Sequence, residues 1–293
     1  MASPPLISPL ELAALLRSGP GSAPLLLDVR WALGSDSGFD DYLQGHLPGA
    51  LFVDLQRDLS GAPGDGGRGG RHPMPHPDDF ELDLAECGVD NGRLVAVYDQ
   101  GHGMAAARCW WLLRHFGKFD VAVLDGGLAA WRAHRLPIEA GLRSIEEGDF
   151  TLGRGVGRNL DANAAALYAA EGVLIDARAP HRYRGEADDV DPVAGHIPGA
   201  VNVPAAGLLA ADGTFLAPDA LRRRFTDAGV TGDRPVAVYC GSGVSACLVA
   251  LALCVAGIDD SAAVYMGSWS DWISDPSRPI ETGAGRTAQP GRV

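Results

Sequence analysis

Residues 236–246 read VAVYCGSGVSA, and the interpretation of the whole chain starts from this stretch. Val236–Tyr239 have strand character and lead into Cys240, and a loop of small residues then leads into the apolar segment 244–258. A cysteine between a strand and a helix start faces loop amides and the positive end of the helix, which both favour its thiolate. A buried structural thiol is the competing interpretation, because free cysteine is among the most buried residue types.

The composition excludes several classes of function. A chain of 293 residues with 46% hydrophobic and 21% charged residues is typical of a globular protein with room for two domains. Its net charge of −13 argues against nucleic acid or an anionic membrane as the main partner. The longest apolar run, 244–258, is too short to cross a bilayer. We therefore expect no nucleic-acid partner and no membrane association.

The cysteine pattern points to a reducing compartment. The five cysteines are an odd number without a C-x-x-C pair, and no Cys/His/Asp cluster has the spacing of metal ligands. We expect reduced thiols in the cytoplasm, no metal site, and no signal peptide, because the N-terminus lacks a basic region. Cys247 and Cys254 are seven residues apart, hence on one face of the expected helix, which favours a core position.

The two halves of the sequence are similar to each other. Four segments recur in the same order: LLLDVR (25–30) as VLIDAR (173–178), GHLPGA (45–50) as GHIPGA (195–200), VAVYD (95–99) as VAVYC (236–240), and VLDGGLAAW (123–131) as VYMGSWSDW (264–272). The number of residues between the two copies of each segment is far larger than the repeat length of a solenoid. The sequence therefore predicts a duplicated domain.

Within each copy, short apolar strands alternate with helical patterns. In the first copy we expect strands at 25–29, 51–55, 95–99 and 122–126, with helices at 9–18, 78–87 and 104–116. This alternation predicts an α/β fold, in which each domain is a parallel sheet with helices on both faces. The expected boundaries are a first domain at 1–142, a linker at 143–160, a second domain at 161–280 and a flexible tail at 281–293.

The duplication serves as an internal control for candidate catalytic residues. Asp99 stands where the second copy has Cys240, so we expect the first domain to be catalytically inactive. His46 and His196 occur in both copies, which favours a structural role for the GH-[LI]-PGA turn. The Gly/Pro-rich segment 59–77 contains two more histidines, His72 and His76. They could approach the site, but a solvated loop position is the default expectation.

Several chemistries can use a cysteine in such a loop. Thiol-dependent phosphatases need an arginine in C-x5-R, and the matching position here is Ala246, so that class is excluded. A cysteine protease needs a partner histidine, which spacing alone neither locates nor excludes. A loop of small residues without a fixed cation suits storage of a sulfur atom as a persulfide on Cys240. Loop amides and the hydroxyls of Ser242 and Ser245 would then hydrogen bond to the outer sulfur.

Together, these segments resemble the tandem-rhodanese sulfurtransferases over residues 7–280. In that family the first domain lacks the cysteine and the second carries it, as here. The loop CGSGVS (240–245) is similar to the CGSGVT loop of 3-mercaptopyruvate sulfurtransferases and less similar to the cationic CRKGVT loop of thiosulfate-specific rhodaneses. The resemblance implies that Cys240 takes sulfur from 3-mercaptopyruvate and passes it to cyanide or to a thiol, such as thioredoxin or a small thiol, without a cofactor. Two alternatives stay open: thiosulfate as the donor, and a non-catalytic module that carries sulfur or binds partners.

The resemblance also implies roles for individual residues. Cys240, Ser242 and Ser245 would be catalytic, and the loop residues Gly241, Gly243 and Val244 would bind substrate. The segment HRYRG (181–185) matches the family's GR-[FY]-x-G segment, so Arg182 is expected to bind the donor carboxylate, as a guanidinium fork can.

This chain departs from the family's pattern at two places. It has EADD (186–189) where animal mercaptopyruvate enzymes have a second arginine, which leaves Arg184 as a candidate substitute. The family's relay aspartate aligns with Gln56, so Asp54 and Asp58 are the candidate acid partners of Ser242, unless it has none. Further positive potential could come from other arginines: Arg68, Arg71 and Arg108.

Overall fold

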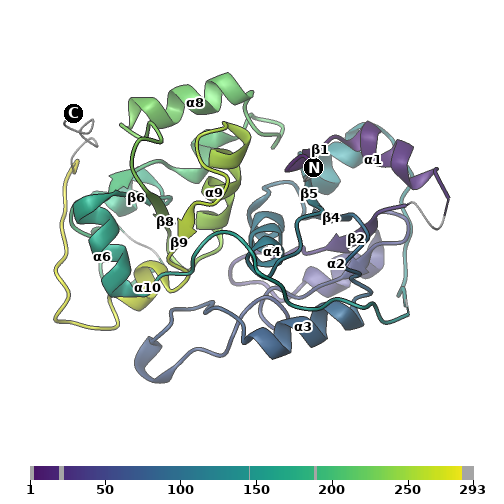
Figure 1. Cartoon of the computed structure of the whole chain (residues 1–293), viewed down its shortest axis with the longest axis horizontal. Helices are drawn as coiled ribbons and strands as arrows, with labels where there is room; N and C mark the ends of the chain where they lie inside the picture. The colour runs from purple at the N-terminus through teal and green to yellow at the C-terminus, as the bar shows by residue number, and fades with distance from the viewer. Residues whose placement is uncertain (1–2, 20–22, 145, 188–189, 286–293) are drawn as a thin grey trace. The chain divides into compact units, whose positions relative to one another are not determined.

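The computed structural model describes residues 3–19, 23–144, 146–187 and 190–285. Two compact units are present (Figure 1). The first combines 1–61, 75–156 and 210–215, and the second combines 62–74, 157–209 and 216–293. Each unit thus receives one short segment from the other half of the chain. The domain limits expected from the sequence stay predictions, and most of the expected tail, residues 286–293, lies outside the described residues.

The first unit is a parallel five-stranded sheet in the order β1-β5-β4-β2-β3. Its strands are β1 (Leu6–Ile7), β2 (Leu25–Asp28), β3 (Leu51–Phe52), β4 (Val95–Tyr98) and β5 (Val121–Leu124). Its helices are α1 (Pro9–Leu16), α2 (Gly38–Gln44), α3 (Pro77–Glu86), α4 (Met104–His115) and α5 (Gly127–Ala133). Side chains of α1 and α5 share a core cluster with one face of the sheet, and α4 packs on β4 and β5.

The second unit repeats this arrangement with a four-stranded parallel sheet in the order β7-β6-β8-β9. Its strands are β6 (Val173–Asp176), β7 (Val201–Asn202), β8 (Val236–Tyr239) and β9 (Ala263–Val264). Its helices are α6 (Ala162–Glu171), α7 (Pro180–Tyr183), α8 (Pro218–Asp227), α9 (Ser245–Val255) and α10 (Ser268–Trp272). The described residues also include two short 3-10 helices, η1 (Asp65–Gly67) and η2 (Ala205–Leu208).

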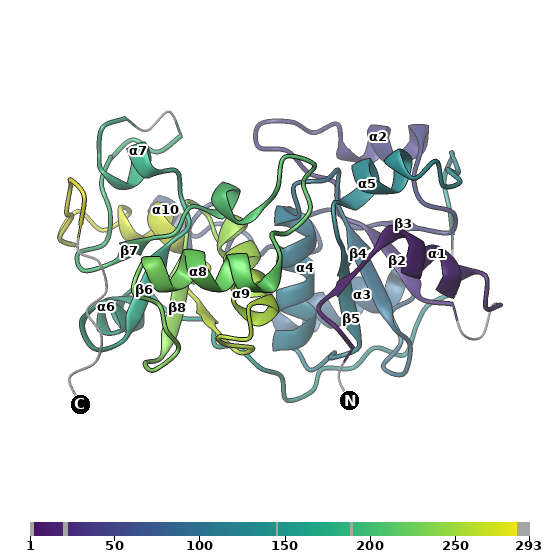
Figure 2. The ribbon, with the colours of Figure 1, turned by 90° about the horizontal axis from the view of Figure 1, so that it is seen from above.

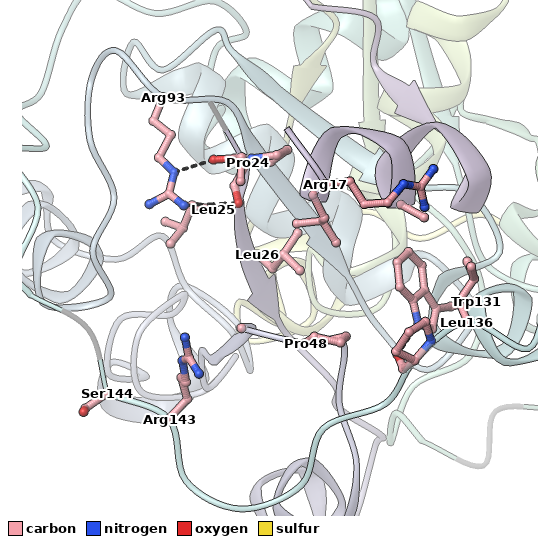
Figure 3. Close-up of a pocket in the computed structure, with 15 residues that line it drawn as sticks. Arg17, Pro24, Leu25, Leu26, Pro48, Arg93, Trp131, Leu136, Arg143 and Ser144 are labelled. Atoms are coloured by element: carbon pink, nitrogen blue, oxygen red, sulfur yellow. Dashed lines mark hydrogen bonds between the residues drawn. The ribbon is translucent and has the colours of Figure 1, made fainter. Parts of the chain in front are cut away.

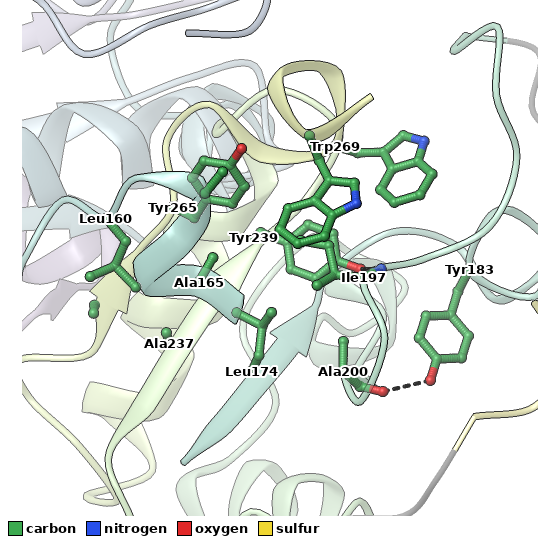
Figure 4. Packing of buried hydrophobic residues seen from close by; sticks show 13 residues of the cluster. Leu160, Ala165, Leu174, Tyr183, Ile197, Ala200, Ala237, Tyr239, Tyr265 and Trp269 are labelled. Atoms are coloured by element: carbon green, nitrogen blue, oxygen red, sulfur yellow. Dashed lines mark hydrogen bonds between the residues drawn. The ribbon is translucent and has the colours of Figure 1, made fainter. Parts of the chain in front are cut away.

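The core of the second unit follows from strand alternation. Leu174 and Tyr239 point to the face covered by α6 and α10, where they pack with Trp269 and Trp272 (Figure 4). The neighbouring residues of β8 face the other way, toward α9, whose side chains are almost all buried. Helices therefore cover both faces of a parallel sheet, which confirms the fold class expected from the sequence.

The duplicated segments are explained by a buried ion pair in each unit. Asp176 and Arg178 form a salt bridge of 2.6 Å, and Arg178 also donates to the main-chain oxygen of Gly195. Asp28 and Arg30 repeat this pair in the first unit, with Arg30 donating to Gly45 O at 2.9 Å. Each D-x-R motif therefore ties the end of a central strand to the GH-[LI]-PGA turn.

Among the described residues, no helix has the length and apolar character needed to span a membrane. The same part of the chain contains no group of three or more His, Cys, Asp or Glu side chains arranged to hold a metal ion.

Candidate active site

Cys240 follows the last residue of β8, at the carboxyl edge of the second sheet, and only 2% of its surface is exposed. Ligands bind beyond this edge in open parallel sheets. The loop is fixed from behind because Trp269 N donates to Cys240 O at 2.9 Å and Ser270 N donates to Gly241 O at 3.0 Å. The nucleophile expected from the sequence is thus held on a loop that α10 positions.

The loop directs a backbone amide at the sulfur. Gly243 N donates to Cys240 Sγ over 3.1 Å, and Gly243 has a φ of +79°, a conformation that favours glycine. Ser268 Oγ accepts from Cys240 N at 3.1 Å. A thiolate on Cys240 would therefore be stabilised by an N–H aimed at it.

A segment distant in the sequence supplies a histidine to the loop. His72 Nδ1 lies 3.0 Å from Ser242 Oγ, and His72 is 6% exposed. The expectation of a solvated loop position for His72 was wrong. The segment 62–74 is anchored on α10, where Asp271 accepts from Gly69 N at 2.7 Å and Ser270 accepts from Arg71 N at 3.1 Å. Gly/Pro-rich composition gave no sign of this anchoring. The other histidine, His76, is exposed and caps the N-terminus of α3, as a default loop position implies.

Two arginines flank Gly241. A Cβ built on Gly241 would lie 3.0 Å from Arg71 Nη2 and 3.5 Å from Arg182 Nη2, so both guanidinium groups stand directly beside this residue. Arg182, on α7, donates to Asp191 Oδ2 at 2.6 Å. Sequence reasoning expected Arg182 near the loop but weighed Arg71 only as one of three weak contributors of positive potential.

The other residues named from the sequence lie as follows. Arg184 is partly exposed and pairs with Glu186 at 2.6 Å. Val244 is buried at the end of the loop, and Ser245 is the first residue of α9, with no hydrogen bond from its hydroxyl among the described residues. The roles given to these residues stay predictions.

The acids considered as partners of Ser242 have other partners within the first unit. Asp58 accepts from Arg57 Nε at 2.5 Å and from Asp54 N at 2.8 Å, and Asp54 accepts from the amides of Gln56 and Arg57. The hydrogen-bond partner that the structure gives Ser242 is the His72 imidazole. Arg108 is fully buried and donates to Leu59 O, while Arg68 is exposed.

The histidines of the two GH-[LI]-PGA turns are structural, as the duplication suggested. His46 and His196 are fully buried, and their Nδ1 atoms lie 2.9 Å from Tyr42 O and 2.7 Å from Tyr183 O, respectively. Each ring stacks on the tyrosine that bonds it. Of the two cysteines expected in the core, Cys247 is fully buried and Cys254 is half-buried.

The first unit contains a pocket of about 500 Å³, lined on one side by Arg17 and Trp131 and on the other by Arg93 and Arg143 (Figure 3). Its lining is mostly apolar, with arginines at the rim. Arg93 donates to Ala23 O and Pro24 O, and Arg143 pairs with Glu139, so both are engaged by the protein. No cysteine, histidine or carboxylate is among its lining residues in the described part of the chain. The pocket therefore does not resemble a catalytic site.

Sequence comparison with known proteins finds sulfurtransferases and rhodanese-like domains along most of the chain. A family model for the rhodanese-like domain matches residues 8–134 and again 160–275. A protein of Pseudomonas aeruginosa named probable 3-mercaptopyruvate sulfurtransferase is 46% identical over 97% of this chain and all of its own length. A protein of Mycobacterium tuberculosis named putative thiosulfate sulfurtransferase SseB is 44% identical over 95% of this chain and 97% of its own.

The structural comparison agrees. The crystal structure of SseA from Escherichia coli, described as a 3-mercaptopyruvate sulfotransferase with a rhodanese fold, aligns with a TM-score of 0.79 and 33% identity. The alignment covers 91% of this chain and 99% of that protein. With two matched segments and four sheet strands that recur in the same order in both units, the chain belongs to the rhodanese family and carries two rhodanese-like domains.

Proposed function

We propose that the protein is a sulfurtransferase that moves a sulfur atom from 3-mercaptopyruvate, through a persulfide on Cys240, to a thiol or to cyanide. The observation that carries the proposal is the uncharged loop around Cys240, in which Gly243 N donates to Sγ at 3.1 Å while Arg182 lies beside Gly241. Relatives of Pseudomonas aeruginosa and Escherichia coli named for this activity support it.

The reaction has two displacement steps. The Cys240 thiolate attacks the donor sulfur, the donor's C–S bond breaks, and its electron pair leaves on the enolate of pyruvate. The proton of the donor thiol then reaches the pyruvate carbon, and the Ser242–His72 pair is placed to carry it. An acceptor thiolate next attacks the outer sulfur of the persulfide and releases Cys240 as a thiolate. Arg182 binds the donor carboxylate, and the amides of Gly241 and Gly243, with Val244 and Ser245, line the sulfur position. This sequence of steps needs no cofactor.

Thiosulfate is the second candidate donor, because the Mycobacterium tuberculosis relative at 44% identity bears that name. Thiosulfate is a dianion, whereas the loop 240–245 holds no lysine or arginine. The charge of the loop therefore favours mercaptopyruvate.

The acceptor and compartment follow from the same chemistry. A persulfide delivers sulfur to a reduced thiol, so thioredoxin or a small thiol is the proposed acceptor. Five free cysteines suit a reducing environment, and we place the protein in the cytoplasm.

Mass spectrometry after treatment with each donor tests this function. We expect one added sulfur on Cys240 of the wild-type protein, none at that position in Cys240→Ser, and a larger kcat/KM for mercaptopyruvate than for thiosulfate. A larger kcat/KM for thiosulfate would assign the second candidate donor. A wild-type protein that gains no sulfur from either donor would instead be a non-catalytic module.

A further inference from the structure

Three charged side chains from separate segments meet at Gly241 in the second unit. Arg71 comes from the segment 62–74, Arg182 from α7 (Figure 2), and Asp191 from the connection that leads to the GHIPGA turn. A Cβ on Gly241 would lie 3.0 Å from Arg71 Nη2, 3.5 Å from Arg182 Nη2 and 3.7 Å from Asp191 Oδ2. These three groups therefore stand directly beside the residue that follows the nucleophile.

Asp191 bridges the two guanidinium groups. Its Oδ1 accepts from Arg71 Nη1, and its Oδ2 accepts from Arg182 Nη2 at 2.6 Å. The Asp191 side chain is 1% exposed, so its charge depends on these cations. Because one carboxylate holds both arginines, it sets their separation and orientation.

Arg71 is also held by a backbone hydrogen bond, and its side chain has an N–H donor that is available to a ligand. Its amide donates to Ser270 Oγ at 3.1 Å, and its Nε is buried with no hydrogen-bond partner among the described residues. A buried donor without a partner carries a desolvation penalty that an arriving acceptor would remove. The cluster thus has an N–H group that a bound anion can satisfy.

The charge of Asp191 affects which anion this cluster suits. Its buried carboxylate lies beside both arginines, and by Coulomb's law it repels an arriving dianion about twice as strongly as a monoanion. Replacing Asp191 with asparagine would remove this negative charge, which favours a dianion more than a monoanion.

We propose that Asp191 determines donor specificity, and that Arg71 is the second arginine that binds the donor carboxylate together with Arg182. The inference rests on the proposed sulfurtransferase function. In this proposal Asp191 selects a monoanionic thiol-bearing keto acid over the dianion thiosulfate. Arg71 takes the role for which Arg184 was the candidate, and Arg184 pairs with Glu186 at the surface.

Donor kinetics of Asp191→Asn test the specificity role, with Asp227→Asn as the control. Asp227 is exposed at the end of α8, and its substitution changes the total charge equally. We expect the ratio of kcat/KM for mercaptopyruvate to that for thiosulfate to fall about tenfold in Asp191→Asn, because of the added local charge. The control should keep the wild-type ratio. An unchanged ratio in folded Asp191→Asn would overturn the proposal.

Arg71→Ala tests the second arginine and stands in if Asp191→Asn does not fold. We expect KM for mercaptopyruvate to rise about tenfold or more, with kcat changed less, because a carboxylate contact is lost. Arg223→Ala, at an exposed position on α8, is the matched control. An unchanged KM in Arg71→Ala would remove Arg71 from the donor site. Persulfide formation in the wild-type protein separates this outcome from failure of the proposed function itself.

Discussion

The Asp99 loop of the first unit and the Cys240 loop of the second have the same frame. Leu128 N donates to Asp99 O at 2.9 Å, as Trp269 N does to Cys240 O at 2.9 Å. The residue before each of these amides has a positive φ, +56° at Gly127 and +54° at Ser268. The duplicated chain therefore builds one cradle of backbone amides twice.

The two cradles differ in what fills them. The Asp99 carboxylate accepts from the amides of Gly101 and Gly103 at 2.9 Å each, and from those of Ala105 and Ala106 at 3.2 and 3.5 Å. In the second loop a backbone amide, Gly243 N, points at a sulfur. The first cradle thus holds its own anion permanently. The second directs a donor at the Cys240 thiol, and we therefore predict that the shared frame supports chemistry in the second unit only.

The largest expected effect concerns a feature that both units share. Asp28→Ala and Asp176→Ala each remove the acid from a buried pair with arginine, and we expect each to destabilise its own unit by about 3–5 kcal/mol. Hydrogen exchange of the amides of β2 and β6 measures the two units separately. Asp227→Asn serves as a surface control. If one of the two variants cost less than about 1 kcal/mol, the D-x-R motif would not have the same structural role in both copies.

A smaller effect is expected where the loops differ. Asp99→Ala leaves four backbone amides without their acceptor, and we expect a loss of about 2–3 kcal/mol in the first unit. Asp99→Asn keeps one oxygen and should lose less. Persulfide formation at Cys240 should be unchanged in folded protein of both variants. A stability loss in Asp99→Ala no larger than that of a surface substitution would show that the carboxylate does not hold this cradle.

The sequence predicted what the duplication makes visible. The repeated strands, the D-x-R and GH-[LI]-PGA segments and the substitution of Asp99 for Cys240 all lie in short, contiguous stretches. Strand periodicity and a comparison of the two copies were therefore sufficient for the fold class and for the position of Cys240.

The partners of the loop could not be predicted in the same way. His72 and Arg71 reach the site because Gly69 and Arg71 bind side chains of α10 about 200 residues later in the chain. Such long-range hydrogen bonds leave no periodic pattern in the sequence. The comparison of the two copies does not reveal them either, because the first copy has no cysteine at the matching position. Asp191 was not predicted for a related reason. A carboxylate near an expected anion site would repel the ligand, and only the structure shows that Asp191 is paired with two arginines.

The Ser242–His72 contact should affect rate more than stability. We expect Ser242→Ala to lower kcat/KM for mercaptopyruvate about 10- to 100-fold, because a proton-transfer contact is lost. His72→Ala should lower it by a similar factor. The double variant should be little worse than either single variant, because the two side chains act through one hydrogen bond. Fully additive losses would mean that Ser242 and His72 act independently.

The smallest effect is expected at a cysteine outside the loop. Burial, reinforced by the negative charge of Asp58, raises the pKa of Cys87 to about 12. At pH 8 only about 10⁻⁴ of this thiol is ionised, and its reaction with iodoacetamide should rise about tenfold per pH unit as the pH approaches 12. We expect peptide mapping at pH 8 to find Cys240 alkylated and Cys87 unmodified. Equal labelling would mean that the loop gives Cys240 no advantage. Because Cys240 is itself only 2% exposed, preferential reaction there would trace to the amides of its loop and not to access of solvent.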